Sequence, residues 1–111
     1  MNKIIKDQYY ESRGGYLRAL EITCRSCGGF ISYYQKDGPG NLRRMYLDRM
    51  SQPSLPNYGR TECEKLTPVR CPHCQKLLGT CYIYEKEDRE AIILYQDAVK
   101  KKIVKQTVLR D

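Results

Sequence analysis

Two pairs of cysteines with C-x-x-C spacing constrain the fold of this chain more than any other feature. The first pair is Cys24 and Cys27, and the second is Cys71 and Cys74. The short spacing lets both thiolates of a pair point at one ion, and two pairs supply the four ligands of a closed tetrahedral zinc site. A closed site leaves no position for water or substrate. We therefore predict that these four cysteines bind one structural zinc ion (Zn²⁺) and that the metal is not catalytic.

The two pairs lie far apart in the sequence. There are 43 residues between Cys27 and Cys71, more than the ~12–20 of ordinary zinc-finger patterns. Metal binding should therefore join distant segments and make folding depend on the metal. Cys63 and Cys81 have no C-x-x-C partner: Cys81 is interpreted as a thiol in the core and Cys63 as a loop residue, neither of them catalytic. His73, the only histidine, is expected to point to solvent rather than to the metal.

Length, charge and hydropathy limit the class of protein. At 111 residues the chain is expected to form one domain. Its 20 Lys and Arg residues outnumber its 13 Asp and Glu residues, and the formal net charge of +7 permits an acidic partner such as nucleic acid. No apolar run approaches the ~20 residues of a membrane span, and no signal peptide is recognisable. We expect a cytoplasmic, reducing location, where C-x-x-C pairs favour metal over disulfides.

The pattern of apolar and aromatic residues predicts a mainly β protein. Residues 1–15 are polar and are interpreted as a mobile lead-in to a zinc-binding β domain at 16–111. The segment 42–50 fits a helix or a strand, and a strand is favoured; residues 51–60 contain two prolines and a glycine and are expected to form a surface loop. Strands are expected at 16–23, 30–35, 77–85 and 91–96, and a last strand or short helix at 98–108.

The second cysteine pair and its flanks, from Val69 to Gly79, resemble the zinc segment of β-tent proteins. That superfamily includes methionine sulfoxide reductase B, the Yippee-like proteins and the regulatory domain of RNA-sensing helicases. The resemblance covers both pairs, their separation and the Leu78-Gly79 exit from the second pair. It implies two antiparallel sheets held over one zinc, a small single domain of β-tent or zinc-ribbon type. It does not imply reductase activity, because no cysteine follows Cys81 and no histidine follows the second pair.

Three functional hypotheses remain open at this stage. The leading one is a non-enzymatic zinc module that contacts nucleic acid through a basic, tyrosine-bearing face. One alternative is a protein–protein interaction module that uses residues 38–60, and a third is an enzyme with Cys63 or Cys81 as nucleophile. Neither a membrane nor a small-molecule substrate is indicated. The candidate nucleic-acid contacts are Lys36, Arg43, Arg44, Arg49, Lys100, Lys101, Lys102 and Lys105.

Overall fold

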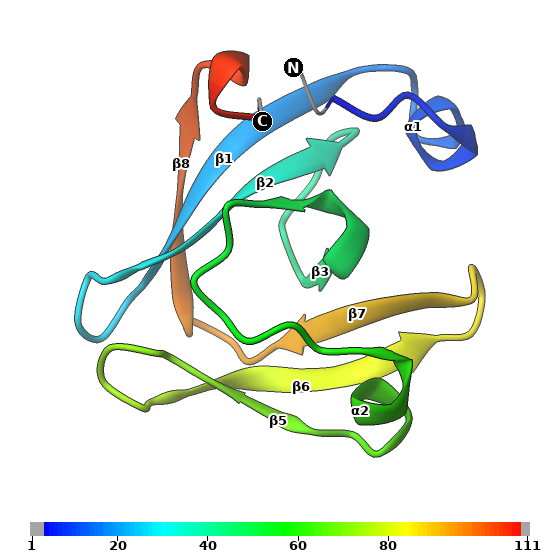
Figure 1. Cartoon of the computed structure of the whole chain (residues 1–111). Helices are drawn as coiled ribbons and strands as arrows, with labels where there is room; N and C mark the ends of the chain where they lie inside the picture. The colour runs from blue at the N-terminus through cyan, green and yellow to red at the C-terminus, as the bar shows by residue number, and fades with distance from the viewer. Residues whose placement is uncertain (1–3, 110–111) are drawn as a thin grey trace.

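Two antiparallel sheets of four strands each form most of the molecule (Figure 1). A computed structural model of the chain describes residues 4–109. The strand order is β4-β2-β1-β8 in the first sheet and β3-β7-β6-β5 in the second. The prediction of a mainly β fold with antiparallel sheets is confirmed. The strands are β1 (Leu17–Cys24), β2 (Phe30–Asp37), β3 (Arg44–Tyr46), β4 (Met50–Ser51), β5 (Pro68–Arg70), β6 (Leu77–Tyr84), β7 (Arg89–Leu94) and β8 (Val99–Val104).

The two cysteine pairs occupy the turns of two β hairpins. β1 pairs with β2, and the turn between them holds the first cysteine pair; β5 pairs with β6 around the second pair. The pairing register shifts just before each turn, between Ile22 and Thr23 in β1 and between Val69 and Arg70 in β5. Figure 1 shows the two turns side by side at one end of the molecule. The hairpins therefore bring the two halves of the predicted metal site together.

The hydrophobic core includes residues from both sheets. Leu20 on β1, Leu78 on β6 and Ile92 on β7 are each at most 2% exposed. Tyr34 on β2 is buried among them, and its hydroxyl oxygen accepts a hydrogen bond of 2.8 Å from the backbone N–H of Tyr46 on β3. Burial of a Leu or Ile side chain contributes roughly 1.5–3 kcal/mol. These contacts pack the two sheets against each other.

The segment at 42–50 contains both strand and helix. It forms strand β3, one turn of 3₁₀ helix, η1 (Leu47–Arg49), and then the two-residue strand β4. The favoured strand prediction holds for β3, which pairs with β7, and for β4, which pairs with β2. Since β3 and β4 belong to different sheets, η1 is the place where the chain crosses between them. A second 3₁₀ helix, η2 (Gln106–Leu109), follows β8.

Two short α-helices were not predicted, although each carries a capping signal. α1 (Gln8–Ser12) begins after Asp7, whose carboxylate accepts hydrogen bonds from two N–H groups of the first turn. α2 (Arg60–Glu64) begins after Gly59, whose N–H donates to the Glu62 side chain at 2.6 Å. These contacts are the side-chain caps that such helix starts favour. No helix within residues 4–109 is long and apolar enough to span a membrane.

A disulfide between Cys63 and Cys81 corrects two predictions. Cys63 lies in helix α2, not in a loop, and Cys81 lies in β6 as expected but is not a free thiol. Both residues are fully buried. The bond fastens α2 to β6, and it formed no part of the sequence prediction because the two cysteines are 18 residues apart without a recognisable motif. The reducing location expected for this chain does not favour such a bond.

A cluster of three arginines and four carboxylates lies at the end of the sheets away from the cysteines. Figure 1 shows this end, where α1 lies near the β6–β7 turn. Ion pairs join η1 and the residue that follows α1 to the second sheet, and another joins η1 to β2. We call this group the arginine cluster. Its members are Arg13, Arg49 and Arg89 with Asp7, Asp37, Asp48 and Glu87.

Arg89 is at the centre of the arginine cluster and is only 5% exposed. Its guanidinium carbon lies 3.6 Å from the ring centroid of Tyr46 and 4.0 Å from that of Tyr9. Two carboxylates bind it, Asp48 at 2.7 Å and Glu87 at 2.9 Å. A guanidinium can be buried in this way because the aromatic faces and the carboxylates replace its water.

Arg49 is buried in the same cluster. It binds Asp37 at 2.9 Å and Asp7 at 2.6 Å, and the Asp7 contact ties the segment before α1 to the first sheet. Arg13, which follows α1, binds Glu87 at 2.7 Å. The division into a mobile lead-in at 1–15 and a domain at 16–111 stays a prediction; the described part of that lead-in contributes Asp7 and Arg13 to the cluster.

Candidate metal centre and basic cavities

The four cysteines of the two C-x-x-C pairs come together in one cluster. The Sγ atoms of Cys24, Cys27, Cys71 and Cys74 all lie within 4.8 Å of one another. Cys24 and Cys74 are 3.8 Å apart, and Cys27 and Cys71 are 3.7 Å apart. Cys24 and Cys71 are buried, whereas Cys27 and Cys74 are exposed. The four sulfurs are therefore close enough to bind one metal ion between the two hairpins.

The two turns have matching backbone geometry. In the first, the N–H of Gly28 donates to the carbonyl of Cys24 at 2.8 Å; in the second, the N–H of Gln75 donates to the carbonyl of Cys71 at 2.9 Å. Gly28 and Gln75 both have left-handed backbones, with φ of 75° and 66°. Glycine adopts this conformation at no steric cost, and glutamine adopts it rarely. Both cysteine turns therefore have the same conformation, but only the first has a residue, Gly28, that favours the left-handed backbone.

The electrostatics of the cluster favour a bound cation. Burial raises the pKa of the Cys71 thiol, but the backbone N–H groups of Cys74 and His73 help to lower it, and the net pKa is about 7. The N–H of Gly29 lowers the pKa of Cys27, but burial and the neighbouring sulfurs outweigh it and raise that pKa to about 12. Four adjacent thiolates repel one another, so all four can ionise together only around a cation.

His73 lies across the first turn and is not part of the sulfur cluster. Its Nε2 atom is 2.8 Å from the carbonyl oxygen of Phe30. A Cβ atom on Gly29 would lie only 2.2 Å from Cδ2 of the His73 ring, so the absence of a side chain at Gly29 makes room for the imidazole. The ring is exposed, as predicted, but it also links the two turns.

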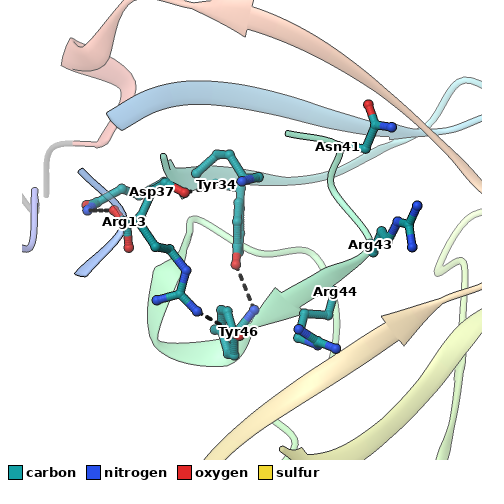
Figure 2. Close-up of a pocket in the computed structure, with 9 residues that line it drawn as sticks. Arg13, Tyr34, Asp37, Asn41, Arg43, Arg44 and Tyr46 are labelled. Carbon is teal, nitrogen blue, oxygen red and sulfur yellow. Dashed lines mark hydrogen bonds between the residues drawn. The ribbon is translucent and has the colours of Figure 1, made fainter. Parts of the chain in front are cut away.

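The predicted basic residues are divided between two cavities. The first, which we call the small cavity, has a volume of about 170 Å³ and lies beside β2 and β3. Lys36, Arg43 and Arg44 line it together with Arg13, which the sequence analysis did not single out. Figure 2 shows Arg13 and Arg44 on either side of Tyr46.

The second, which we call the large cavity, has a volume of about 910 Å³. It is lined by Arg43, Lys100 and Lys101, by Arg25 from the first cysteine turn, and by residues that connect β7 with β8. Arg43 and Asn41 line both cavities, so the two are neighbours. Arg25 and Arg13 could not be found from sequence, because only the fold places them beside cations from distant segments.

Three of the predicted nucleic-acid contacts lie outside both cavities. Arg49 has a side chain that is only 1% exposed and is bound to carboxylates of the arginine cluster, so it does not contribute to an exposed basic face. Lys102 and Lys105 are exposed and line neither the small nor the large cavity.

Comparison with known proteins gives no relative: no protein-family model, no curated protein and no solved structure matches this chain.

Proposed function

We propose that this protein is a non-enzymatic zinc-binding module that binds nucleic acid through the large cavity. The observation that carries this proposal is the composition of the cavity wall. Four cations line it, and among its lining residues Asp97 is the only carboxylate. Lys and Arg neutralise phosphates, and Tyr95 in the same wall is 46% exposed and offers a ring on which a base can stack. The cations are Arg25, Arg43, Lys100 and Lys101.

The chemistry of the sulfur cluster supports zinc as the metal. Thiolate ligands select soft or borderline ions, and four of them around one ion are typical of structural zinc. No histidine or carboxylate joins the cluster among the described residues. Four protein ligands leave no position for substrate, which supports a structural rather than a catalytic role. The two sheets meeting beside this cluster are also the arrangement implied by the resemblance to β-tent proteins, to which we propose the fold belongs.

The remaining thiols give no support to an enzyme. Cys63 and Cys81 are buried and joined in a disulfide, so neither is available as a nucleophile in this state. The alternative of a protein-interaction module at residues 38–60 draws on a segment that is only partly buried, with residues 52–60 mostly exposed. Its buried residues include Met45, Tyr46, Arg49, Ser51 and Leu55.

Metal analysis tests the first half of the proposal. The purified protein should contain one zinc ion per chain, and Cys71→Ser should lose it, because a structural site with three thiolates binds far more weakly. Circular dichroism should then show an unfolded or loosened chain, since zinc binding contributes ~10–16 kcal/mol that is linked to folding. Full metal content in the Cys71→Ser variant, or a folded wild type without metal, would show that the ligand set is wrong.

A mobility-shift experiment tests the second half. The double variant Lys100→Glu/Lys101→Glu changes two cations of the large cavity, and Lys102→Glu/Lys105→Glu makes the same charge change outside it. The first should weaken binding to a single-stranded oligonucleotide roughly tenfold or more and flatten the slope of log affinity against log salt. Each lost phosphate contact should reduce that slope by about 0.7. The second should change affinity much less.

Two results would count against nucleic-acid binding at the large cavity. One is the absence of any retardation of the wild type at moderate salt. The other is an equal loss of affinity in both double variants, which would indicate net charge alone. In either case the lysines would serve solubility, as ordinary surface charge does in small domains.

A further inference from the structure

The small cavity has the size of a site for a small ion. Its volume of about 170 Å³ is several times the ~30 Å³ that one water molecule occupies in the liquid. It is well below the ~300–1,000 Å³ of sites for drug-sized ligands. A ligand that fills it should therefore be a compact group of a few heavy atoms.

Three cations of the small cavity have no carboxylate partner. Lys36 donates only to the backbone carbonyls of Asp37 and Pro39, at 3.2 and 3.3 Å. Arg44 donates to the hydroxyl of Tyr82 at 2.8 Å. The Arg43 backbone carbonyl accepts from the N–H of Leu94 at 3.0 Å, but its guanidinium makes no hydrogen bond or ion pair with any residue in the part of the chain that the structure describes. The wall therefore carries positive charge that no carboxylate of the described chain binds directly.

The remaining charged groups of the wall are already paired. Arg13 binds Glu87 at 2.7 Å, and Asp37, the only carboxylate among the lining residues, binds Arg49 at 2.9 Å. The Asp37 charge is thus offset by an arginine outside the cavity. Asp37 raises the pKa of Lys36, but by less than burial, Arg18 or Arg13 lowers it.

A further cation lies directly opposite Lys36 in the first sheet. Arg18 on β1 pairs in register with Lys36 on β2, and like charges at such positions destabilise a sheet. Arg18 donates to the carbonyls of Gly38 and Gly40, so its charge also has no carboxylate partner in the described chain. Burial lowers the pKa of Lys36, and the nearby Arg18 and Arg13 lower it further. A bound anion would relieve this repulsion.

Two buried tyrosine hydroxyls add neutral donors to the wall. The Tyr46 hydroxyl oxygen accepts from Arg13 at 3.2 Å, and the Tyr34 hydroxyl oxygen accepts from a backbone N–H at 2.8 Å. Within residues 4–109 neither hydroxyl donates a hydrogen bond. Both side chains line the cavity, as Figure 2 shows, and each is at most 8% exposed. The wall also carries the side-chain oxygens of Gln35, Asp37 and Asn41, but its cations outnumber its one carboxylate, which suits an oxyanion.

We propose that the small cavity binds a single phosphate group through Lys36, Arg43, Arg44 and the hydroxyls of Tyr34 and Tyr46. Arginine forks match the oxygen geometry of phosphate, and the compact ammonium of lysine adds a point charge. The group can belong to a free phosphate ion or to the backbone of a bound nucleic acid. This inference goes beyond the proposed function because a phosphate group binds here whether or not a nucleic acid occupies the large cavity.

Isothermal titration with inorganic phosphate at constant ionic strength tests the site. The variants Lys36→Met and Arg44→Gln each remove one wall cation and keep much of the side-chain stem. Lys102→Gln makes the same charge change outside the cavity and is the matched control. The wild type and Lys102→Gln should bind phosphate saturably with equal affinity. Lys36→Met and Arg44→Gln should each bind roughly tenfold or more weakly, since charge-assisted hydrogen bonds are lost.

Amide NMR spectra of the wild type during a phosphate titration locate the site without any variant, so they also test the proposal if a variant fails to fold. Phosphate should shift the amide signals of residues 34–46 most strongly. Shifts confined to residues 100–105, or the absence of saturable binding by the wild type, would overturn the proposal. Unchanged affinity in both Lys36→Met and Arg44→Gln would overturn it as well.

An oligonucleotide without terminal phosphates identifies the source of the phosphate group. If it displaces inorganic phosphate from the protein, the cavity takes a backbone phosphate; if both bind together, it takes the free ion. Either result supports the site. Phosphate binding without any oligonucleotide binding would refute the proposed nucleic-acid function and leave the phosphate site standing.

Discussion

Gly29 sets how closely the two cysteine turns approach each other. At this position the His73 ring of the second turn occupies the space of a side chain. The sequence predicted that His73 is exposed and not a ligand, but not that its imidazole lies against Gly29. That contact depends on how the two hairpins are placed relative to each other. No local sequence pattern predicts this placement, because 43 residues separate the two cysteine pairs.

We therefore predict that Gly29→Ala weakens metal binding. The new methyl group must displace the imidazole or separate the turns, at a cost of about 1–3 kcal/mol for overpacking. Competition with a zinc-binding dye measures the change in affinity. The double variant Gly29→Ala/His73→Ala removes the collision and should recover much of the loss, as a double-mutant cycle would show. Wild-type affinity in Gly29→Ala alone would mean that the ring moves aside freely.

Among the elements, the long strands were the easiest to predict and the short helices the hardest. β1, β2, β6 and β7 carry apolar residues that alternate or run together next to turn residues, and all four lie close to their expected positions. α1 and α2 have five residues each and show no helical periodicity, so only the caps at Asp7 and Gly59 mark them. The link from α2 to β6 is a disulfide, which no spacing rule indicates.

Removing that disulfide should destabilise the protein without releasing the metal. Cys63→Ala/Cys81→Ala frees α2 from β6. Without the bond, the unfolded chain regains the conformational entropy of a closed loop of about 18 residues, so the free energy of unfolding should fall by about 3 kcal/mol. Urea denaturation without reductant measures this loss of stability. Metal analysis of the double variant should still find one ion per chain. Mild reductant should leave the stability of the double variant unchanged. In the wild type it breaks the disulfide and should lower the free energy of unfolding by a similar amount. Loss of the metal in this variant would mean that Cys63 or Cys81 is a ligand.

At the scale of the whole molecule, the sheets are joined at both ends by different chemistry. At one end the four cysteines lie close enough to bind one metal ion, and at the other the arginine cluster connects the segment after α1, β2, η1 and the second sheet through ion pairs. Only the first was predicted, because C-x-x-C pairs have a recognisable spacing. Arg13, Arg49 and Arg89 look like ordinary solvated charges in the sequence, and Arg49 was assigned to a nucleic-acid surface for that reason.

The arginine cluster predicts a pH dependence of stability. Burial raises the pKa of Glu87, but hydrogen bonds from Arg89 and Arg13 outweigh it and hold the pKa below its ordinary value of 4.5. A carboxyl with a lowered pKa in the folded state stabilises the protein above pH 4.5, and this contribution is lost as the pH falls through the folded-state pKa.

Glu87→Gln should therefore be less stable than the wild type at pH 7, and the difference should shrink as the pH falls below about 4.5. Urea denaturation of both proteins over this range measures it. Protonation of the cysteines affects both proteins alike, so the difference between them reports Glu87. A difference that does not change with pH would mean that the Glu87 charge does not stabilise the fold.

Each hairpin contributes only two of the four sulfurs, so neither half of the chain can complete the metal site alone. The 43 residues between them tether the two hairpins to each other, which favours pairing within one chain over pairing between chains. During refolding of a crowded sample, the second hairpin of a neighbouring chain competes with the tethered one. Because the missing half is identical in every copy, an exchange of hairpins between two chains would close two complete sites with the same four cysteines.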